Sequence, residues 1–216
     1  MLTDEQIEFN KNKFINLLKR ITRQDSLIEE LIHKLEQSDF FTAPASTQYH
    51  SAFKGGLCQH SLNVYEELVN LINMKYPTLI QLNEETQEEE VITNNPYSEE
   101  TLIIVALLHD FSKMNFYEVS TRNVKDESGN WTQVPYIKVK DAKDKFIYSH
   151  HGANSEYMTG RFIPLTLEES VAIIHHMGWS DEHSDAKTIS EVYNRFPLAL
   201  YLHIADCLAT FTREKI

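Results

Sequence analysis

Several histidine and aspartate residues occupy positions where their side chains could bind a metal ion together. Ten of the 216 residues are histidine, and His109 is followed directly by Asp110 at the end of the apolar run 103–108. A carboxylate at the end of a buried run carries a large desolvation cost unless a cation or hydrogen bonds compensate it. Taken alone, this dipeptide could also be a helix end whose polar groups are satisfied by the backbone.

Two further predicted helices strengthen the metal interpretation. His60 lies near the start of one, and Asp206 lies on the apolar face of another. Three helices would then each direct a ligand inward. Because adjacent helical residues project about 100° apart, His109 can face one ion while Asp110 bridges to another.

The surrounding sequence predicts a mainly helical single domain. Capping boxes at Thr3 with Gln6 and at Thr166 with Glu169 mark two helix starts, and Ser98 begins a helix that should be central and buried. Helices are expected over about 57–74, from Ser98 through Leu108, over 166–176 and over about 198–211. Residues 1–40 are expected to form N-terminal helices packed on the core built by 41–216.

Two stretches break the helical pattern. Residues 79–97 hold five glutamates and no sustained apolar period, so we expect a solvated acidic loop. Residues 116–147 alternate in β-favouring types around a turn at 126–130, which predicts a small inserted β-hairpin. Arg122, Trp131 and Tyr136 in this hairpin could form a basic and aromatic surface for a nucleotide base, although such residues more often pack the hairpin itself.

Composition excludes several classes of protein. The formal net charge of −12 opposes a surface for duplex nucleic acid. No run predicts a membrane span and the first residues do not resemble a secretion signal, so we expect a cytoplasmic protein. Cys58 and Cys207 are too few for a disulfide framework and are expected to be reduced and structural. Oligomeric state is left open.

Five segments together resemble the HD-domain metal-dependent phosphohydrolases, in particular small HD proteins of phages and bacteria. They are GGLCQHSLNV, ALLHDFSK, YSHHGANSEYM, AIIHHMGW and LHIADCLAT, within about residues 41–210. The resemblance implies a helical HD-domain bundle. It also implies that a metal-bound hydroxide hydrolyses a small phosphorylated substrate, such as a nucleotide, cyclic nucleotide or short oligonucleotide.

The resemblance also implies roles for individual residues. His60, His109, Asp110 and Asp206 match the core metal site, and His151 and His176 match the ligands of a second ion. His150 and His175 are the alternatives within each histidine pair, as ligands or phosphate contacts. Manganese or iron is expected first, with cobalt, nickel, zinc or magnesium as alternatives. Asp110 and Lys113 are the catalytic candidates, Lys113 because the similar HDxxK arrangement points its ammonium group at phosphate.

Other roles and functions also fit some of these residues. Without the resemblance, Lys113 could be a solvated lysine near a helix C-terminus. His33, His50, His183 and His203 are expected to be structural or exposed. Two other functions fit the same ligand set: a metal-stabilised nucleotide-binding phage factor without turnover, and a di-iron oxygenase that cleaves a polyol with dioxygen.

Overall fold

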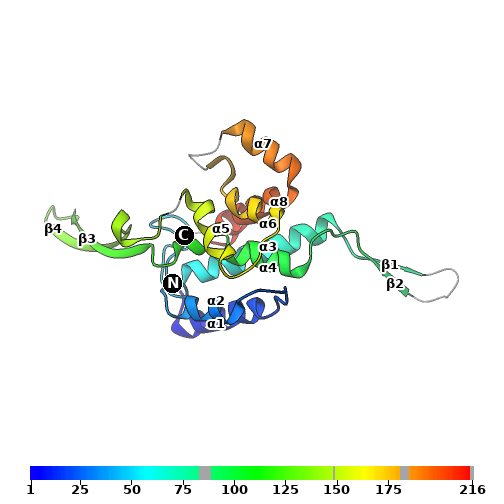
Figure 1. Ribbon diagram of the computed structural model, residues 1–216. Helices are drawn as coiled ribbons and strands as arrows, with labels where there is room; N and C mark the ends of the chain where they lie inside the picture. Colours follow the sequence, from blue (N-terminus) through cyan, green and yellow to red (C-terminus); the bar gives the residue numbers. More distant parts are fainter. Residues whose placement is uncertain (83–88, 148, 181–184, 215–216) are drawn as a thin grey trace.

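The computed structural model describes residues 1–82, 89–147, 149–180 and 185–214. Helices form its body, and two antiparallel hairpins extend from that body in opposite directions (Figure 1). The predicted fold class, a helical bundle with a small inserted hairpin, is therefore confirmed. Among the described residues, no helix is both long enough and apolar enough to cross a membrane.

The structure is mainly helical, and one buried helix, α4, is central to it. The bounds of the helices are α1 Asp4–Leu18, α2 Ile28–Glu36, α3 Gly56–Lys75, α4 Glu99–Leu108, α5 His151–Gly160, α6 Leu167–Ile174, α7 Ala186–Arg195 and α8 Pro197–Leu208, with a π-helical turn at Ala209–Arg213. Short 3₁₀ turns lie at Phe111–Lys113, Ala142–Asp144 and Gly178–Ser180. Both predicted capping boxes are present.

Helix α4 lies between the two halves of the hydrophobic core and contributes buried residues to both. Ile104 and Leu108 pack into one half together with residues of α1, α2 and α3. Val105 and Ala106 pack into the other half, which is built by α3, α6, α7 and α8. The prediction of a central, buried helix is confirmed, because every residue from Leu102 to Leu108 is buried. Buried residues of the N-terminal helices α1 and α2 belong to the first half of this core.

The inserted hairpin is formed by β3 Tyr117–Lys125 and β4 Trp131–Val139, as the alternating sequence predicts. Its turn is tightened by Asp126, which accepts hydrogen bonds from the backbone amides of Ser128 and Asn130. Most of its residues are exposed, and it projects away from the helices (Figure 1).

The expectation of a loop over residues 79–97 is wrong in part. Strands β1 Leu79–Leu82 and β2 Glu89–Ile92 pair antiparallel, with Leu79 opposite Ile92. Apolar and β-branched residues flank the glutamates and have strand propensity of their own, which the acidic run obscured. Residues 83–88 of this stretch lie outside the described part. Helices α5 and α7 were also not predicted.

Candidate metal centre

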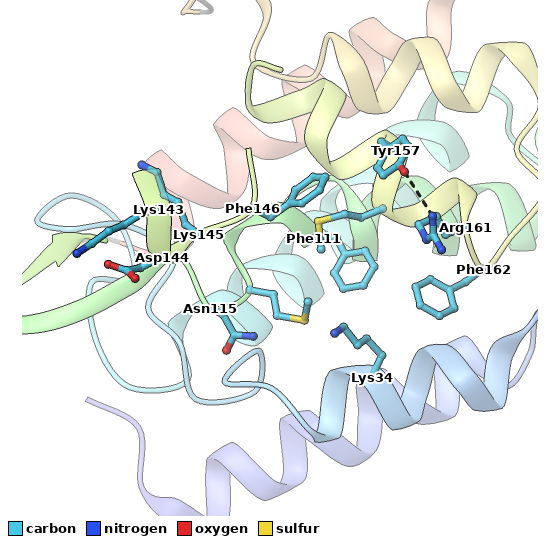
Figure 2. Close-up of a pocket in the computed structure, with 12 residues that line it drawn as sticks. Lys34, Phe111, Asn115, Lys143, Asp144, Lys145, Phe146, Tyr157, Arg161 and Phe162 are labelled. Carbon is cyan, nitrogen blue, oxygen red and sulfur yellow. Dashed lines mark hydrogen bonds between the residues drawn. The ribbon is translucent and has the colours of Figure 1, made fainter. Parts of the chain in front are cut away.

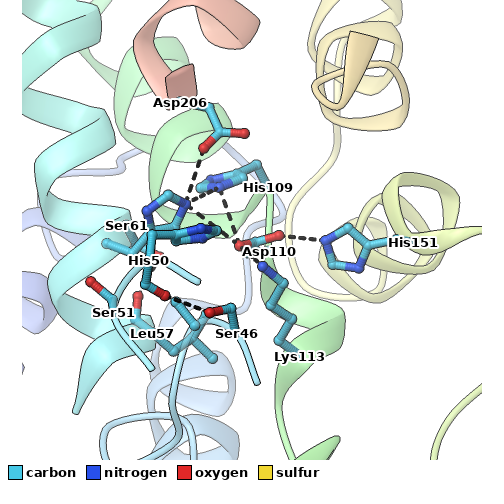
Figure 3. Close-up of polar contacts among 12 residues, drawn as sticks. Ser46, His50, Ser51, Leu57, Ser61, His109, Asp110, Lys113, His151 and Asp206 are labelled. Atoms are coloured by element: carbon cyan, nitrogen blue, oxygen red, sulfur yellow. Dashed lines mark hydrogen bonds and ion pairs between the residues drawn. The ribbon is translucent and has the colours of Figure 1, made fainter. Parts of the chain in front are cut away.

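Five helices of the core, and the 3₁₀ turn that follows one of them, bring the predicted ligands to one place. His60 lies in the second turn of α3, and Asp206 lies near the end of α8. His109 is the C-cap residue of α4, and Asp110 is the N-cap residue of the 3₁₀ turn that follows. His151 is the first residue of α5, and His176 follows the end of α6. Figure 3 shows Asp110 in the middle of the group, with His109, Lys113 and His151 around it.

Each of the four imidazole rings is held through its Nδ1 atom. His109 Nδ1–H donates to the Ala106 carbonyl at 2.8 Å, and His176 Nδ1–H donates to the Ile173 carbonyl at 2.7 Å. The Nδ1 atom of His60 lies 3.0 Å from a carboxylate oxygen of Glu214, and that of His151 lies 2.9 Å from Ser112 Oγ. Hydrogen bonds of this kind select the tautomer and the ring orientation of metal-binding histidines. The Nε2 atoms are left to face the centre.

The Nε2 atoms and carboxylate oxygens converge over short distances. His60 Nε2 lies 3.3 Å from His109 Nε2 and 3.2 Å from Asp206 Oδ1. The ligand atoms of these three residues all lie within 4.8 Å of one another, and the same holds for one atom each of His109, Asp110 and His176. Within the described residues, the cluster could therefore hold a metal ion.

The two oxygens of Asp110 face different histidines. Its Oδ2 lies 3.7 Å from His60 Nε2 and 3.5 Å from His109 Nε2. Its Oδ1 contacts His151 Nε2 and lies 3.6 Å from His176 Nε2. His151 lies outside the three-residue groups named above, and its ring centroid is 5.3 Å from that of His176. One carboxylate thus spans the two halves of the cluster.

The charges of the site favour a cation. Burial alone would lower the pKa of His60, but hydrogen bonds and charge from Asp206 and Glu214 raise it to about 10. Burial lowers the pKa of His109 to about 3, which leaves its Nε2 lone pair available at neutral pH. Burial would raise the pKa of Asp110, but Lys113, His109 and His151 hold it well below its usual value. The carboxylates that attract a proton to His60 would stabilise a metal ion in its place.

One buried atom provides an independent test of whether a metal fits. His176 is fully buried, and its Nε2 has no hydrogen-bond partner among the described residues. A buried polar atom without a partner is costly, since its desolvation is not compensated. Since Nδ1 donates to Ile173, Nε2 carries a lone pair directed at Asp110 Oδ1. A cation bound between these two acceptors would satisfy both, so the residues present fit a metal ion.

A cavity of about 260 Å³ opens onto this cluster. Its wall includes His60, Asp110, Lys113 and Asp206. The Lys113 ammonium group lies 2.7 Å from Asp110 Oδ2. Burial would lower the pKa of Lys113, but Asp110 and further neighbours raise it to about 12, so the side chain is charged. Lys113 is thus a mostly buried cation at the cavity and not a solvated lysine.

Sequence reasoning missed two residues of the site. Glu214 accepts hydrogen bonds from His60 Nδ1, from Asn63 Nδ2 at 2.9 Å and from Ser51 Oγ at 2.7 Å. His50 was expected to be structural or exposed, but its ring lies 4.8 Å from that of His60 and it lines the cavity. One nitrogen each of His50 and His60 and an oxygen of Glu214 form a third group that could hold an ion. Neither residue belongs to a motif with recognisable spacing.

The other candidates lie at the edge of the cluster or away from it. His150 and His175 flank α5 and α6 as cap residues, and neither belongs to the three ligand groups. His203 lines the cavity and donates through Nδ1 to the His176 carbonyl at 2.8 Å. His33 is exposed, as expected, and His183 lies outside the described residues.

The hairpin residues predicted to contact a substrate are not part of this site. Arg122 stacks on Tyr136 at 5.4 Å, and Lys125 lies 5.3 Å from the ring of Trp131. Arg122 and Tyr136 line a separate surface hollow beside Thr47 and Gln48, and none of the residues named here lines the cavity at the metal cluster.

Comparison with known proteins assigns the chain to no family. No protein-family model matches the chain, and no curated protein or solved structure is significantly similar to it.

Proposed function

We propose that the chain is a metal-dependent phosphohydrolase that acts on a nucleotide, a cyclic nucleotide or a short oligonucleotide. The observation that carries the proposal is the convergence of four inward-facing imidazole Nε2 atoms on both oxygens of Asp110, beside the buried ammonium group of Lys113. The resemblance of five sequence segments to HD-domain phosphohydrolases supports it.

In this proposal the site would hold two ions, and Asp110 would be a ligand of both. One would be held by His60, His109 and Asp206 with Asp110 Oδ2, and the other by His151 and His176 with Asp110 Oδ1. Manganese or iron suits this mixture of imidazole and carboxylate ligands, and cobalt, nickel, zinc and magnesium are the alternatives. When bound, such ions lower the pKa of coordinated water and neutralise the non-bridging oxygens of a phosphate.

The protein's own residues orient these ligands and receive the substrate. Glu214 and Ser112 hold the rings of His60 and His151 through Nδ1. Lys113 is placed to bind a phosphate oxygen, because its charge is fixed at the cavity wall. The cavity volume of about 260 Å³ is below the 300–1,000 Å³ common for pockets that enclose a whole ligand. It would therefore take the phosphate and leave the base at its mouth.

A substrate panel tests this proposal directly. Purified protein loaded with manganese, iron, cobalt or magnesium is assayed against phosphomonoesters, mononucleotides, cyclic nucleotides and short oligonucleotides. Asp110→Asn should abolish turnover, while Asp126→Asn in the distant hairpin turn should leave it unchanged. Release of phosphate or cleavage of a diester by the wild type and the control variant, and not by Asp110→Asn, supports the proposal.

Two other results would contradict it. Iron-dependent oxygen consumption with a polyol and no phosphoryl activity would make the protein an oxygenase. Tight nucleotide binding with no product under any of the metals would make it a binding protein.

A further inference from the structure

A second cavity of about 550 Å³ is larger than the one at the metal cluster and lies elsewhere in the fold. Its walls come from α2, from the segment around the 3₁₀ turn Ala142–Asp144 and from the C-terminal half of α5 (Figure 2). Phe111 and Met114 contribute to its apolar floor. A volume of this size is within the range of about 300–1,000 Å³ that is common for small-ligand sites.

Positive charge is concentrated around this cavity in a chain of net charge −12. Four basic residues line it, and they are Lys34, Lys143, Lys145 and Arg161. Asp144 is the one acidic residue among the lining residues of this cavity, all of which are described. None of the four cations forms an ion pair with a carboxylate in the described part of the chain, whereas Arg23, Lys113 and Arg213 elsewhere are paired. The cavity therefore has positive charge that no carboxylate of the described residues neutralises through an ion pair.

Aromatic rings stand beside these cations. Phe146 and Tyr157 are stacked, with ring centroids 5.8 Å apart and an interplanar angle of 12°. Both are partly exposed large side chains, at 41% and 38%. Arg161 donates to the Tyr157 hydroxyl at 3.3 Å and lies 6.0 Å from its ring centroid. In Figure 2 Lys34 and Arg161 lie toward one end of the cavity, and Lys143 and Lys145 toward the other.

This combination fits a ligand with a planar ring and a phosphate. Aromatic faces and arginine stack on nucleobases whatever their sequence, and unpaired lysine and arginine side chains bind phosphate through charge-assisted hydrogen bonds. We propose that the cavity bounded by Lys34, Lys145, Phe146, Tyr157 and Arg161 is a second binding site, which takes a mononucleotide. The two cavities share no lining residue, so this site does not depend on the activity of the metal centre.

The two sites are nevertheless joined by two elements. Helix α5 begins with His151 at the metal cluster and carries Tyr157 and Arg161 at the second cavity. The 3₁₀ turn after α4 presents Lys113 to the metal cavity and Phe111 to the other. A ligand in the second cavity would thus contact α5 and the 3₁₀ turn, the two elements that position His151 and Lys113 at the metal cluster.

Calorimetric titration of AMP, GMP, CMP and UMP into the full chain tests the proposal. The Asp110→Asn variant is titrated in parallel, so that turnover and binding at the metal centre do not contribute. We expect saturable binding with a dissociation constant below about 1 mM in both proteins. Lys145→Ala and Arg161→Ala should each weaken it about tenfold, the usual effect of losing one charge-assisted hydrogen bond. Phe146→Ala should weaken binding of the nucleotide and leave binding of inorganic phosphate unchanged.

A matched control and a direct mapping complete the experiment. Arg195 is an exposed arginine that lies 5.5 Å from the ring of Phe196, away from the cavity, so Arg195→Ala should bind like the wild type. Photolabelling with 8-azido-AMP should mark peptides within residues 143–162. Absence of saturable binding for all four nucleotides would overturn the proposal. Binding lost in Asp110→Asn but retained in Lys145→Ala and Arg161→Ala would also overturn it, because the nucleotide would then occupy only the metal centre.

Discussion

The Nε2 atoms of His60 and His109 face each other at 3.3 Å, although the Nδ1 atom of each ring is already held by another group. Two Nε2 lone pairs that face each other in this way repel. A proton or a metal ion bound by these nitrogens, close to the nearby carboxylates, would remove the repulsion. Asp206 and Glu214 provide the negative charge that attracts either one. A metal ion bound to this cluster would therefore compete with a proton.

The first prediction concerns metal content. Protein incubated with manganese or iron(II) and then desalted should retain the ion, and its melting temperature should rise with metal concentration, because binding to the folded state stabilises it. Asp110→Asn should lose the metal, while Asp126→Asn should keep it. Elemental analysis and thermal melting measure both effects, and a wild type that retains no ion would refute the metal centre.

The second prediction separates the two halves of the cluster. His151→Ala and His176→Ala should mainly weaken the ion on the Asp110 Oδ1 side. His60→Ala should mainly weaken the ion on the Oδ2 side, because its contacts are to Asp206 and His109. Titration of metal-free protein with manganese, followed by electron paramagnetic resonance, counts the ions that remain. Retention of two ions in all three variants would show that the assignment is wrong.

The third prediction concerns Glu214, which does not need to touch a metal to affect its binding. Burial would raise the pKa of Glu214, but hydrogen bonds from His60, Ser51 and Asn63 and the charge of His60 lower it to about 2, so the carboxylate is ionised and fixes His60. Glu214→Gln should weaken metal binding by about 10- to 100-fold, the usual effect of removing such an orienting partner. Glu118→Gln, in an exposed ion pair with Lys138, is the control. Equal metal affinity in both variants would remove Glu214 from the site.

The contrast between Glu214 and Asp110 shows what the sequence could predict. Asp110 follows an apolar helix directly, and its burial could be deduced from its neighbours along the chain. Glu214 acts on His60 across 154 residues, in a C-terminal turn with no distinctive pattern. Such a pairing depends on how α3 and α8 pack, and no local periodicity encodes it. His50 was misjudged for the same reason.

The same distinction between local signals and long-range contacts applies to the secondary structure. Capping boxes, the apolar run Leu102–Leu108 of α4 and the alternating β3–β4 hairpin are local signals, and each was predicted from its own residues. Helix α7 begins with Asp185 accepting hydrogen bonds from the backbone amides of Lys187 and Thr188, a cap that is also local but was not recognised. The β1–β2 hairpin was not predicted, because the run of glutamates obscured the strand propensity of the residues on either side of it.

The fourth prediction concerns stability and its dependence on pH. Glu169 is fully buried, and Arg23 holds it through hydrogen bonds of 2.7 and 2.8 Å. Burial would raise the pKa of Glu169, but Arg23, Thr166 and Thr101 lower it below its usual value of 4.5. The stability that this contributes is present above pH 4.5 and is lost as the pH falls further.

Arg23→Met should therefore lower the free energy of unfolding at pH 7 by about 3–5 kcal/mol, because the carboxylate stays buried without its cation. In this variant burial should raise the pKa of Glu169, so the difference from the wild type should shrink as the pH falls and Glu169 is protonated. Arg20→Met, which breaks an exposed ion pair with Glu99, should cost at most about 1 kcal/mol. Urea denaturation at pH 7 and pH 4 measures these differences, and equal losses in both variants would argue against a structural role for the buried pair.

The last prediction concerns Lys113, whose ammonium group lies 2.7 Å from Asp110 Oδ2. A bound ion would compete with this ammonium for the same oxygen, so Lys113→Met should bind metal at least as tightly as the wild type. Its turnover should nevertheless fall about 100-fold, since one oriented charge that stabilises the phosphate in the transition state is lost. Metal affinity must then stay the same or rise while the rate of phosphate release falls. If Lys113→Met loses its metal, the lysine supports the centre and does not bind substrate; if it keeps wild-type turnover, its charge has no part in the reaction.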